Sequence, residues 1–213
     1  MTRLAPYLLC GAFIMASSIP GSTQPKDTPQ TPAAAQTPLQ VGAKAPDFEL
    51  KDLQGKTYKL SELADKTVVL EWFNPDCPFV KKHHLSTHSM IDTQAFAAKQ
   101  GVVWLAINSA GEGKQGFGLD RNKEAAKEYK MDYPVLMDES GSVGKLYGAK
   151  TTPHMFVISK GTVVYEGAID DRPDTEAPGK LNYVRAALMQ LSAGKTIDPA
   201  QTKPYGCSVK YAS

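Results

Sequence analysis

The sequence lacks the features that would point to a nucleic acid, a polyanion or a membrane as its partner. Its formal net charge is only +2, and Lys and Arg are interspersed with Asp and Glu, so there is no electrostatic case for nucleic acid. The N-terminal apolar run, residues 4–15, is shorter than the roughly 20 residues that a membrane-spanning helix needs. The length allows one substantial core, so we expect one domain with flanking segments.

The first 21 residues have the pattern of an export signal. Arg3 supplies the positive start, residues 4–15 are apolar, and small residues follow where a signal peptidase could cut. We expect cleavage and a periplasmic or secreted protein with no membrane attachment. The alternatives are an uncleaved tether and a lipid on Cys10, although Cys10 follows Leu9 rather than a small residue.

The segment after the signal differs in composition from the rest of the chain. Residues 22–39 alternate Pro, Thr, Gln and Ala with few large apolar side chains, so they cannot bury enough surface to offset their ordering entropy. We predict a disordered linker over 22–39, a globular domain over 40–195 and a C-terminal tail over 196–213.

Strand and helix patterns alternate through the globular part. Residues 47–52 and 56–60 flank Gly55 as a hairpin would. The other expected strands are 67–73, 101–108, 133–138 and an antiparallel pair, 151–159 with 162–170. The expected helices are 78–99, 121–129, 141–148 and 179–191. This order predicts an α/β fold with a mixed central sheet flanked by helices.

The stretch "EWFNPDCPFVKKHH", residues 71–84, places a lone cysteine where a buried strand ends and a helix begins. Ligands and chemistry gather at this edge of open α/β sheets. A proline suits the first helical turn, so Cys77 is expected at or beside the N-cap, where the helix dipole favours a thiolate and lowers the thiol pKa. Three basic residues could reinforce the thiolate or could form a solvated face: Lys81, Lys82 and His83.

Several longer pieces resemble one known family. "VVLEWFNPDCP" resembles the active-site turn of thioredoxin-fold proteins, and "VGAKAPDFELKDLQGKTYKLSEL" resembles the opening of the AhpC/TSA branch, the peroxiredoxin and TlpA-like redoxins. "TTPHMFVIS" and "VVYEGAIDD" are similar to that fold's cis-proline strand and its hairpin partner. With "PYGCSVKY" near the end, the resemblance is to exported peroxiredoxin-like redoxins and covers residues 41–192. It implies a thioredoxin-like fold with an N-terminal hairpin extension.

The resemblance also implies roles for individual residues. Cys77 matches the nucleophilic cysteine, and Pro153 matches the cis-proline whose loop faces that sulfur. Thr152 would offer backbone hydrogen bonds to a bound thiol or disulfide. Glu71 matches a buried acid that moves protons for the thiols, and burial would raise its pKa. The alternative for Glu71 is an edge residue without a chemical role.

The sequence departs from the family pattern around the cysteine. Val80 replaces the second cysteine of C-x-x-C, so Cys77 cannot form a local disulfide. Peroxiredoxins carry Thr or Ser three residues before the cysteine and Pro seven before, where this chain has Asn74 and Leu70. A peroxide pocket also needs an arginine near the sulfur. The candidates are Arg172, which we favour, and then Arg121 and Arg185.

Cys207 is the predicted replacement for the missing thiol. If Cys10 leaves with the signal, the mature chain keeps two cysteines, an even number suited to an oxidising compartment. The tail beyond the last helix can extend on the order of 50 Å, enough to bring Cys207 to Cys77. Cys207 would then resolve oxidised Cys77 as a disulfide. A static bridge and an intermolecular bridge are the alternatives.

Two functions follow from these residues. The first is an exported thiol oxidoreductase, antioxidant in type, that reduces a peroxide or a protein disulfide, is reset by an external thiol or dithiol, and has no cofactor or metal. The second is a copper carrier in which Cys77 acts with histidine. The histidines that suggest it are His83, His84, His88 and His154. The sequence does not predict the oligomeric state.

Overall fold

The computed structural model describes residues 39–212. The predicted signal, Cys10 and the predicted linker up to residue 38 lie outside the described residues. Within 39–212, no helix is long and apolar enough to cross a membrane.

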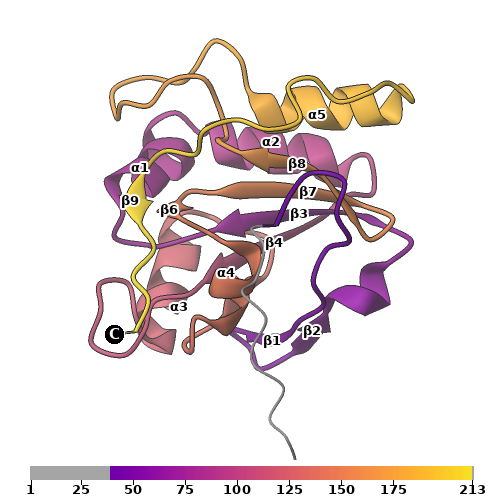
Figure 1. Cartoon of the computed structure of the whole chain (residues 1–213). Helices are drawn as coiled ribbons and strands as arrows, with labels where there is room; N and C mark the ends of the chain where they lie inside the picture. Colours follow the sequence, from indigo (N-terminus) through magenta and orange to yellow (C-terminus); the bar gives the residue numbers. More distant parts are fainter. Residues whose placement is uncertain (1–38, 213) are drawn as a thin grey trace, which may run out of the picture. The chain divides into compact units, whose positions relative to one another are not determined.

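A seven-stranded mixed sheet forms the centre of the domain (Figure 1). Its strands are β1 (Glu49–Asp52), β2 (Thr57–Lys59), β3 (Thr67–Trp72), β4 (Val103–Asn108), β5 (Val135–Met137), β7 (Met155–Ser159) and β8 (Thr162–Gly167). Their spatial order is β2-β1-β5-β4-β3-β7-β8. β3, β4 and β5 are parallel, whereas β1, β2, β7 and β8 pair antiparallel. The mixed sheet and the N-terminal hairpin predicted from the sequence are confirmed.

Helices connect the strands and cover the sheet. They are η1 (Leu60–Leu63), α1 (Pro78–Lys81), η2 (Lys82–Ser86), α2 (Ser89–Ala98), α3 (Leu119–Glu128), α4 (Ser142–Tyr147) and α5 (Tyr183–Ser192). Figure 1 shows α2 and α5 side by side over one face of the sheet.

The prediction of one continuous helix over 78–99 is wrong. α1 widens into the π-helical turn η2, where the Thr87 N–H donates to the Lys82 carbonyl five residues back at 2.8 Å. His88 then adopts a left-handed backbone with φ 54°, and α2 begins at Ser89. A wide turn followed by a left-handed residue ends the regular hydrogen-bond ladder and redirects the chain.

Two apolar layers form the core, one on each face of the sheet. Successive residues of β3 alternate between them: Val69 belongs to one layer, and Val68 and Leu70 belong to the other. The first layer also contains Phe73, Cys77 and residues from α2, α3 and α5, and the second contains residues from α4. Glu71 follows Val69 by two positions and therefore faces the layer that contains Cys77.

The C-terminal tail packs along the domain. It is the yellow segment that runs from α5 past α1 in Figure 1 and forms β9 (Cys207–Ser208) beside β6 (Thr151–Thr152). Thr202 fixes its beginning, because its N–H donates to the Glu166 carbonyl at 3.0 Å. Lys210 fixes its end, because its carbonyl accepts from the Gly111 N–H at 2.8 Å. The tail therefore crosses the edge of the domain at which β3 ends and Cys77 lies.

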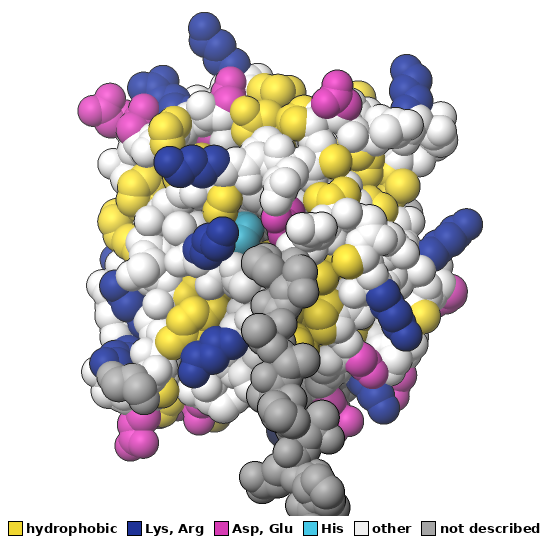
Figure 2. All heavy atoms as spheres, in the orientation of Figure 1, with side chains coloured by type: hydrophobic (Ala, Val, Ile, Leu, Met, Phe, Trp, Pro, Cys, Tyr) yellow, Lys and Arg dark blue, Asp and Glu magenta, His cyan; other side chains and the backbone are white. Residues whose placement is uncertain are grey.

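Charged groups of both signs are scattered over the face drawn in Figure 2. This distribution agrees with the small net charge of +2, and it gives no single-sign field on that face that would attract a polyelectrolyte.

Candidate active site

Cys77 lies at the junction of β3 and α1. Its backbone is extended (φ −77°, ψ 124°), and Pro78 begins the helix, so Cys77 is the N-cap, as its position before a proline predicts. The Cys77 N–H donates to the Asn74 carbonyl at 3.2 Å. The thiol is completely buried, so a substrate reaches this sulfur only when a neighbouring segment moves.

The cis-proline loop faces this thiol. The Thr152–Pro153 peptide bond is cis, as expected, and the Cys77 Sγ–H donates to the Thr152 carbonyl oxygen at 3.0 Å. A carbonyl oxygen accepts hydrogen bonds only, so this contact forms with the protonated thiol. When Cys77 ionises, the contact is lost and the Thr152 carbonyl becomes free for another donor.

Cys207 lies beside Thr152 and within hydrogen-bond reach of the Cys77 side chain. β9 pairs antiparallel with β6, and Cys207 is the register partner of Thr152. Both cysteines are free. Burial, followed by a hydrogen bond with the Cys77 side chain, raises the pKa of the Cys207 thiol to about 12. The structure therefore brings together the two cysteines that the sequence predicted to react, as a pair of reduced thiols.

A glycine allows the tail to approach this closely. Gly206 has φ +137°, and a Cβ placed on it would overlap the Thr152 carbonyl oxygen and lie 2.8 Å from the Thr152 carbonyl carbon. Only glycine combines this backbone conformation with so close an approach. The "YGC" sequence is therefore a local requirement for placing Cys207 beside the cis-proline loop.

Glu71 is fully buried and accepts three hydrogen bonds. Its Oε1 accepts from His84 Nε2 at 2.7 Å, and its Oε2 accepts from Trp104 Nε1 and from the Tyr133 hydroxyl, each at 3.1 Å. A carboxylate in the interior requires partners of this kind. The alternative interpretation of Glu71 as an edge residue is wrong, since no part of its side chain is exposed.

The predicted solvated face of basic residues is also wrong for two of its three members. Lys82 and His83 are buried, whereas Lys81 is half-buried. The Lys82 ammonium donates to the Arg172 carbonyl at 2.7 Å, and His83 hydrogen-bonds Ser89 and Tyr205. These two side chains therefore bind the loop after β8 and the C-terminal tail.

The three arginines that were candidates for a peroxide pocket each contact another side chain. The Arg172 guanidinium binds Asp174 at 2.7 Å and lies 3.8 Å from Glu176, so these ion pairs must open before it can reach a substrate at the sulfur. Arg121 instead binds Asp76, the residue before Cys77, at 2.8 Å. Arg185 lies over the ring of Phe96. Arg121 is therefore the candidate tied most directly to the cysteine loop.

The histidines do not assemble around Cys77. His84 binds Glu71, and the His88 Nδ1–H donates to the His84 carbonyl at 3.1 Å. The His154 Nδ1 accepts from the Lys150 N–H at 3.3 Å. Burial, and then the charge of Lys150, lower the pKa of His154 to about 3, so its imidazole is neutral. Among residues 39–212, no three His, Cys, Asp or Glu side chains are grouped to hold a metal ion.

Some site residues were not identified from the sequence. Trp104 lies in the expected strand 101–108 but was given no role there, and Tyr133, Asp170 and Tyr205 were not singled out. Tyr205, in the tail, had a usable signal, because it is an aromatic residue two positions before a cysteine in a polar segment. Tyr133 gave none, since its contact with Glu71 joins residues 62 positions apart.

Comparisons with known proteins show the family of this chain. The Redoxin family model matches residues 40–183. The thiol-disulfide oxidoreductase ResA of Geobacillus thermodenitrificans is 30% identical over 125 residues, which cover 59% of this chain and 67% of the relative. The solved structure of an uncharacterized conserved protein from Geobacillus kaustophilus is 31% identical, with a TM-score of 0.74 over 82% of this chain and 93% of the other.

A third comparison shows the fold alone. The peroxidoxin BcpB of Mycobacterium tuberculosis is 20% identical, with a TM-score of 0.53 over 77% of this chain and 99% of the other. The family model covers well over half of the chain, and the described domain has the mixed sheet and flanking helices of its thioredoxin-like neighbours. The chain therefore belongs to the Redoxin family, as an oxidoreductase with a thioredoxin-like fold.

Proposed function

We propose that this protein is an exported thiol-dependent oxidoreductase in which Cys77 is the nucleophile and Cys207 resolves the oxidised intermediate. Its substrate is a peroxide or a protein disulfide, and an external thiol or dithiol restores the reduced state. The pattern of residues 1–21 supports export. The name of the ResA relatives, thiol-disulfide oxidoreductase, supports the type of chemistry.

One observation carries the proposal. Thr152 contacts both cysteines, since its carbonyl accepts from Cys77 Sγ at 3.0 Å and its register partner in β9 is Cys207. A disulfide requires two cysteine side chains that lie close together and face each other, and the Cys207 side chain already hydrogen-bonds the Cys77 side chain. The chain has Val80 where other thioredoxin folds carry a second cysteine, so Cys207 supplies the second thiol.

The two thiols together supply the two electrons that reduce one peroxide or one disulfide. The Cys77 thiolate attacks a peroxide oxygen, the O–O bond breaks, and the leaving oxygen takes a proton, which gives Cys77 sulfenic acid. Cys207 then attacks the Cys77 sulfur, the S–O bond breaks, and the leaving hydroxide takes the Cys207 proton and departs as water. With a disulfide substrate, the Cys77 thiolate attacks one sulfur, the substrate S–S bond breaks, and the other sulfur leaves as a thiolate, which gives a mixed disulfide. Cys207 then attacks the Cys77 sulfur and releases the second substrate thiolate.

The high pKa of Cys207 means that Cys207 reacts after Cys77. With a pKa of about 12, roughly one Cys207 in 10⁵ is ionised at pH 7. Cys207 is therefore a poor nucleophile toward outside substrates while Cys77 is reduced. Its proton leaves as the S–S bond forms, because the departing hydroxide or thiolate is a base at that position.

Glu71 and His84 supply a proton reservoir behind this site. The hydrogen bond between His84 Nε2 and Glu71 Oε1 is 2.7 Å long and lies in a fully buried position. The His84 Nδ1 has no hydrogen-bond partner within the described residues. The hydrogen bond to Glu71 is therefore the polar contact of the His84 ring, and it gives a path for a proton between the two side chains. Glu71 acts as the general acid and base for the thiols through this pair.

Cysteine variants test the proposal. The wild type, Cys207→Ser and Cys77→Ser are treated with one equivalent of hydrogen peroxide or of a small aromatic disulfide, and thiols are counted over time. We expect the wild type to lose two thiols in one event, Cys207→Ser to stop at a trappable sulfenic acid or mixed disulfide, and Cys77→Ser to stay unreacted. Oxidation of Cys207 at the wild-type rate in Cys77→Ser would contradict the assigned roles. The faster of the two oxidants identifies the substrate class.

A further inference from the structure

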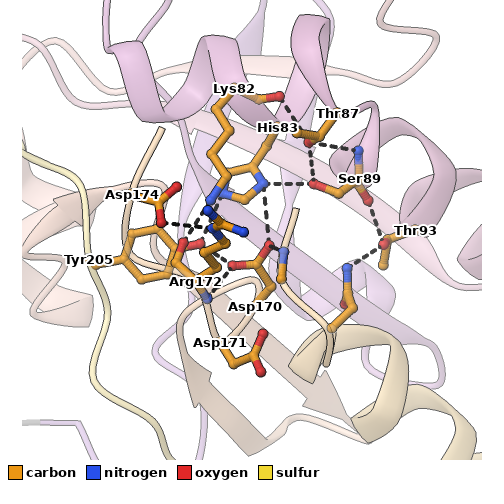
Figure 3. A network of polar contacts seen from close by, with 12 residues as sticks. Lys82, His83, Thr87, Ser89, Thr93, Asp170, Asp171, Arg172, Asp174 and Tyr205 are labelled. Carbon is orange, nitrogen blue, oxygen red and sulfur yellow. Dashed lines mark hydrogen bonds and ion pairs between the residues drawn. The ribbon is translucent and has the colours of Figure 1, made fainter. Parts of the chain in front are cut away.

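Tyr205, two positions before Cys207, is half-buried and takes part in a polar network (Figure 3). Its hydroxyl donates to Asp170 Oδ1 and also contacts His83 Nε2 at 3.1 Å. Asp170 is fixed in turn, because its carboxylate accepts from the backbone N–H groups of Arg172 at 3.0 Å and Gly179 at 2.8 Å. The tail is therefore held at this point by a rigid acceptor.

The hydrogen bonds of Tyr205 set the tautomer of His83. Since the Tyr205 hydroxyl has one proton and gives it to Asp170, His83 Nε2 must donate to Tyr205. His83 Nδ1 is then the acceptor for the Ser89 hydroxyl at 2.7 Å. Burial lowers the pKa of His83 to about 4, which outweighs the opposing effect of the Asp170 charge and keeps the imidazole in this neutral form. Burial and the bond to Asp170 raise the pKa of Tyr205, so it keeps its proton.

The ring of Tyr205 packs on the helical segment that begins at Cys77. Its centroid lies 5.9 Å from that of Phe79 and 6.1 Å from that of His83. The Lys82 ammonium lies 5.5 Å from the Tyr205 centroid. The helical segment that begins at Cys77 therefore also binds Tyr205 of the tail. This contact fixes the positions of the two cysteines relative to each other.

Tyr211 provides a second, separate anchor beyond Cys207. Its hydroxyl donates to the Ala149 carbonyl at 2.8 Å, and its side chain packs against Gly141 and Gly144 at α4. None of these partners belongs to the segment 77–83. The two tyrosines thus hold the tail on either side of Cys207, but only Tyr205 relates it to the helix of Cys77.

We infer that Tyr205 is a positioning residue for the disulfide-forming step, and that its hydroxyl, held by Asp170 and His83, places the Cys207 sulfur for attack on oxidised Cys77. This inference rests on the proposed resolving role of Cys207. Tyr205 acts on the reacting sulfur through the chain, because Gly206 is the single residue between it and Cys207.

The test separates the two chemical steps. Tyr205→Phe keeps the ring and removes both hydroxyl contacts, and Tyr211→Phe is the matched control at the other anchor. Oxidation of Cys77 by hydrogen peroxide is measured in a Cys207→Ser background, and disulfide formation is measured with both cysteines present. We expect Tyr205→Phe to leave the first step unchanged and to slow disulfide formation about tenfold or more, with sulfenic acid accumulating, because a charge-assisted hydrogen bond is lost. Tyr211→Phe should retain the wild-type rate within about twofold.

Asp170→Asn gives a second check and a substitute if Tyr205→Phe fails to fold. Its amide oxygen still accepts from Tyr205 but carries no charge, and its NH2 group replaces the oxygen that accepts from the Gly179 N–H, so we expect disulfide formation to slow in this variant as well. Disulfide formation at the wild-type rate in both variants would overturn the inference, as would equal slowing in Tyr211→Phe. If the wild type itself forms no Cys77–Cys207 disulfide, the proposed function fails. If it does and Tyr205→Phe matches it, only this inference fails.

Discussion

Substitution of Gly206 by alanine tests whether the close approach of the tail to the cis-proline loop determines the rate at which the Cys77–Cys207 disulfide forms. The added Cβ would lie 2.8 Å from the Thr152 carbonyl carbon, and the residue would have to keep φ +137°. Non-bonded carbon atoms prefer separations of about 3.5–4.0 Å, so the tail and the loop must separate by about 1 Å. The backbone conformation adds a cost of roughly 1–3 kcal/mol for a residue other than glycine.

The expected consequences are kinetic and can be measured directly. A displacement of about 1 Å costs on the order of 100-fold in a step that depends on alignment, so Gly206→Ala should form the Cys77–Cys207 disulfide roughly 100 times more slowly. Cys77, which is fully buried, should also be alkylated faster by iodoacetamide, because the covering strand is displaced. Rates are followed by thiol counting and mass spectrometry.

Gly194→Ala is the matched control for this experiment. Gly194 also has a left-handed backbone, φ +66°, but a Cβ there meets no atom within 4 Å. This variant carries a backbone cost of about 1 kcal/mol without displacing the tail, so it should react at the wild-type rate. If Gly206→Ala reacts as fast as Gly194→Ala and its Cys77 stays protected, the close packing of the tail does not set the disulfide-forming rate.

Three further predictions concern Glu71, His154 and Arg121. Glu71→Gln should slow both oxidation and re-reduction roughly 100-fold in stopped-flow assays, since it removes the proton acceptor; unchanged rates would exclude the acid-base role. The lowered pKa of His154, about 3, means that unfolded protein binds a proton first as pH falls from about 6.5. The wild type should therefore lose about 3 kcal/mol of stability from this group between pH 7 and pH 4.5 in urea unfolding, and His154→Gln should lack that component. Arg121→Met opens a partly exposed ion pair with Asp76, so its free energy of unfolding should fall by no more than about 1 kcal/mol.

The order of strands and the placement of Cys77 could be predicted because they depend on local patterns. The apolar run over 67–73 has the composition of a strand buried on both faces, and β3 occupies Thr67–Trp72. Proline after Cys77 correctly predicted the N-cap. The break near His88 was missed, because apolar residues on both sides of it keep nearly helical spacing. The π-helical turn is stabilised by tertiary contacts of Lys82 and His83 that no local pattern shows.

The sequence predicted the part of the site that lies within family motifs. It did not predict how the C-terminal tail folds back onto that part. The motifs identified Cys77, the cis bond before Pro153 and the buried Glu71. The length of the tail allowed Cys207 to reach Cys77 but did not specify how. Its path depends on the antiparallel pairing of β9 with β6 and on the contact between Tyr205 and Asp170, which lie 35 positions apart. Such contacts follow from the packed fold rather than from spacing along the chain.

The most direct test of the central claim is peptide mapping by mass spectrometry of the full chain after one equivalent of hydrogen peroxide, without reductant. The account predicts a monomer in which the peptide containing Cys77 is linked to the peptide containing Cys207. Cys77 found as a sulfinic acid beside a free Cys207 thiol would contradict the account. A disulfide between two Cys77 peptides of different molecules would contradict it as well.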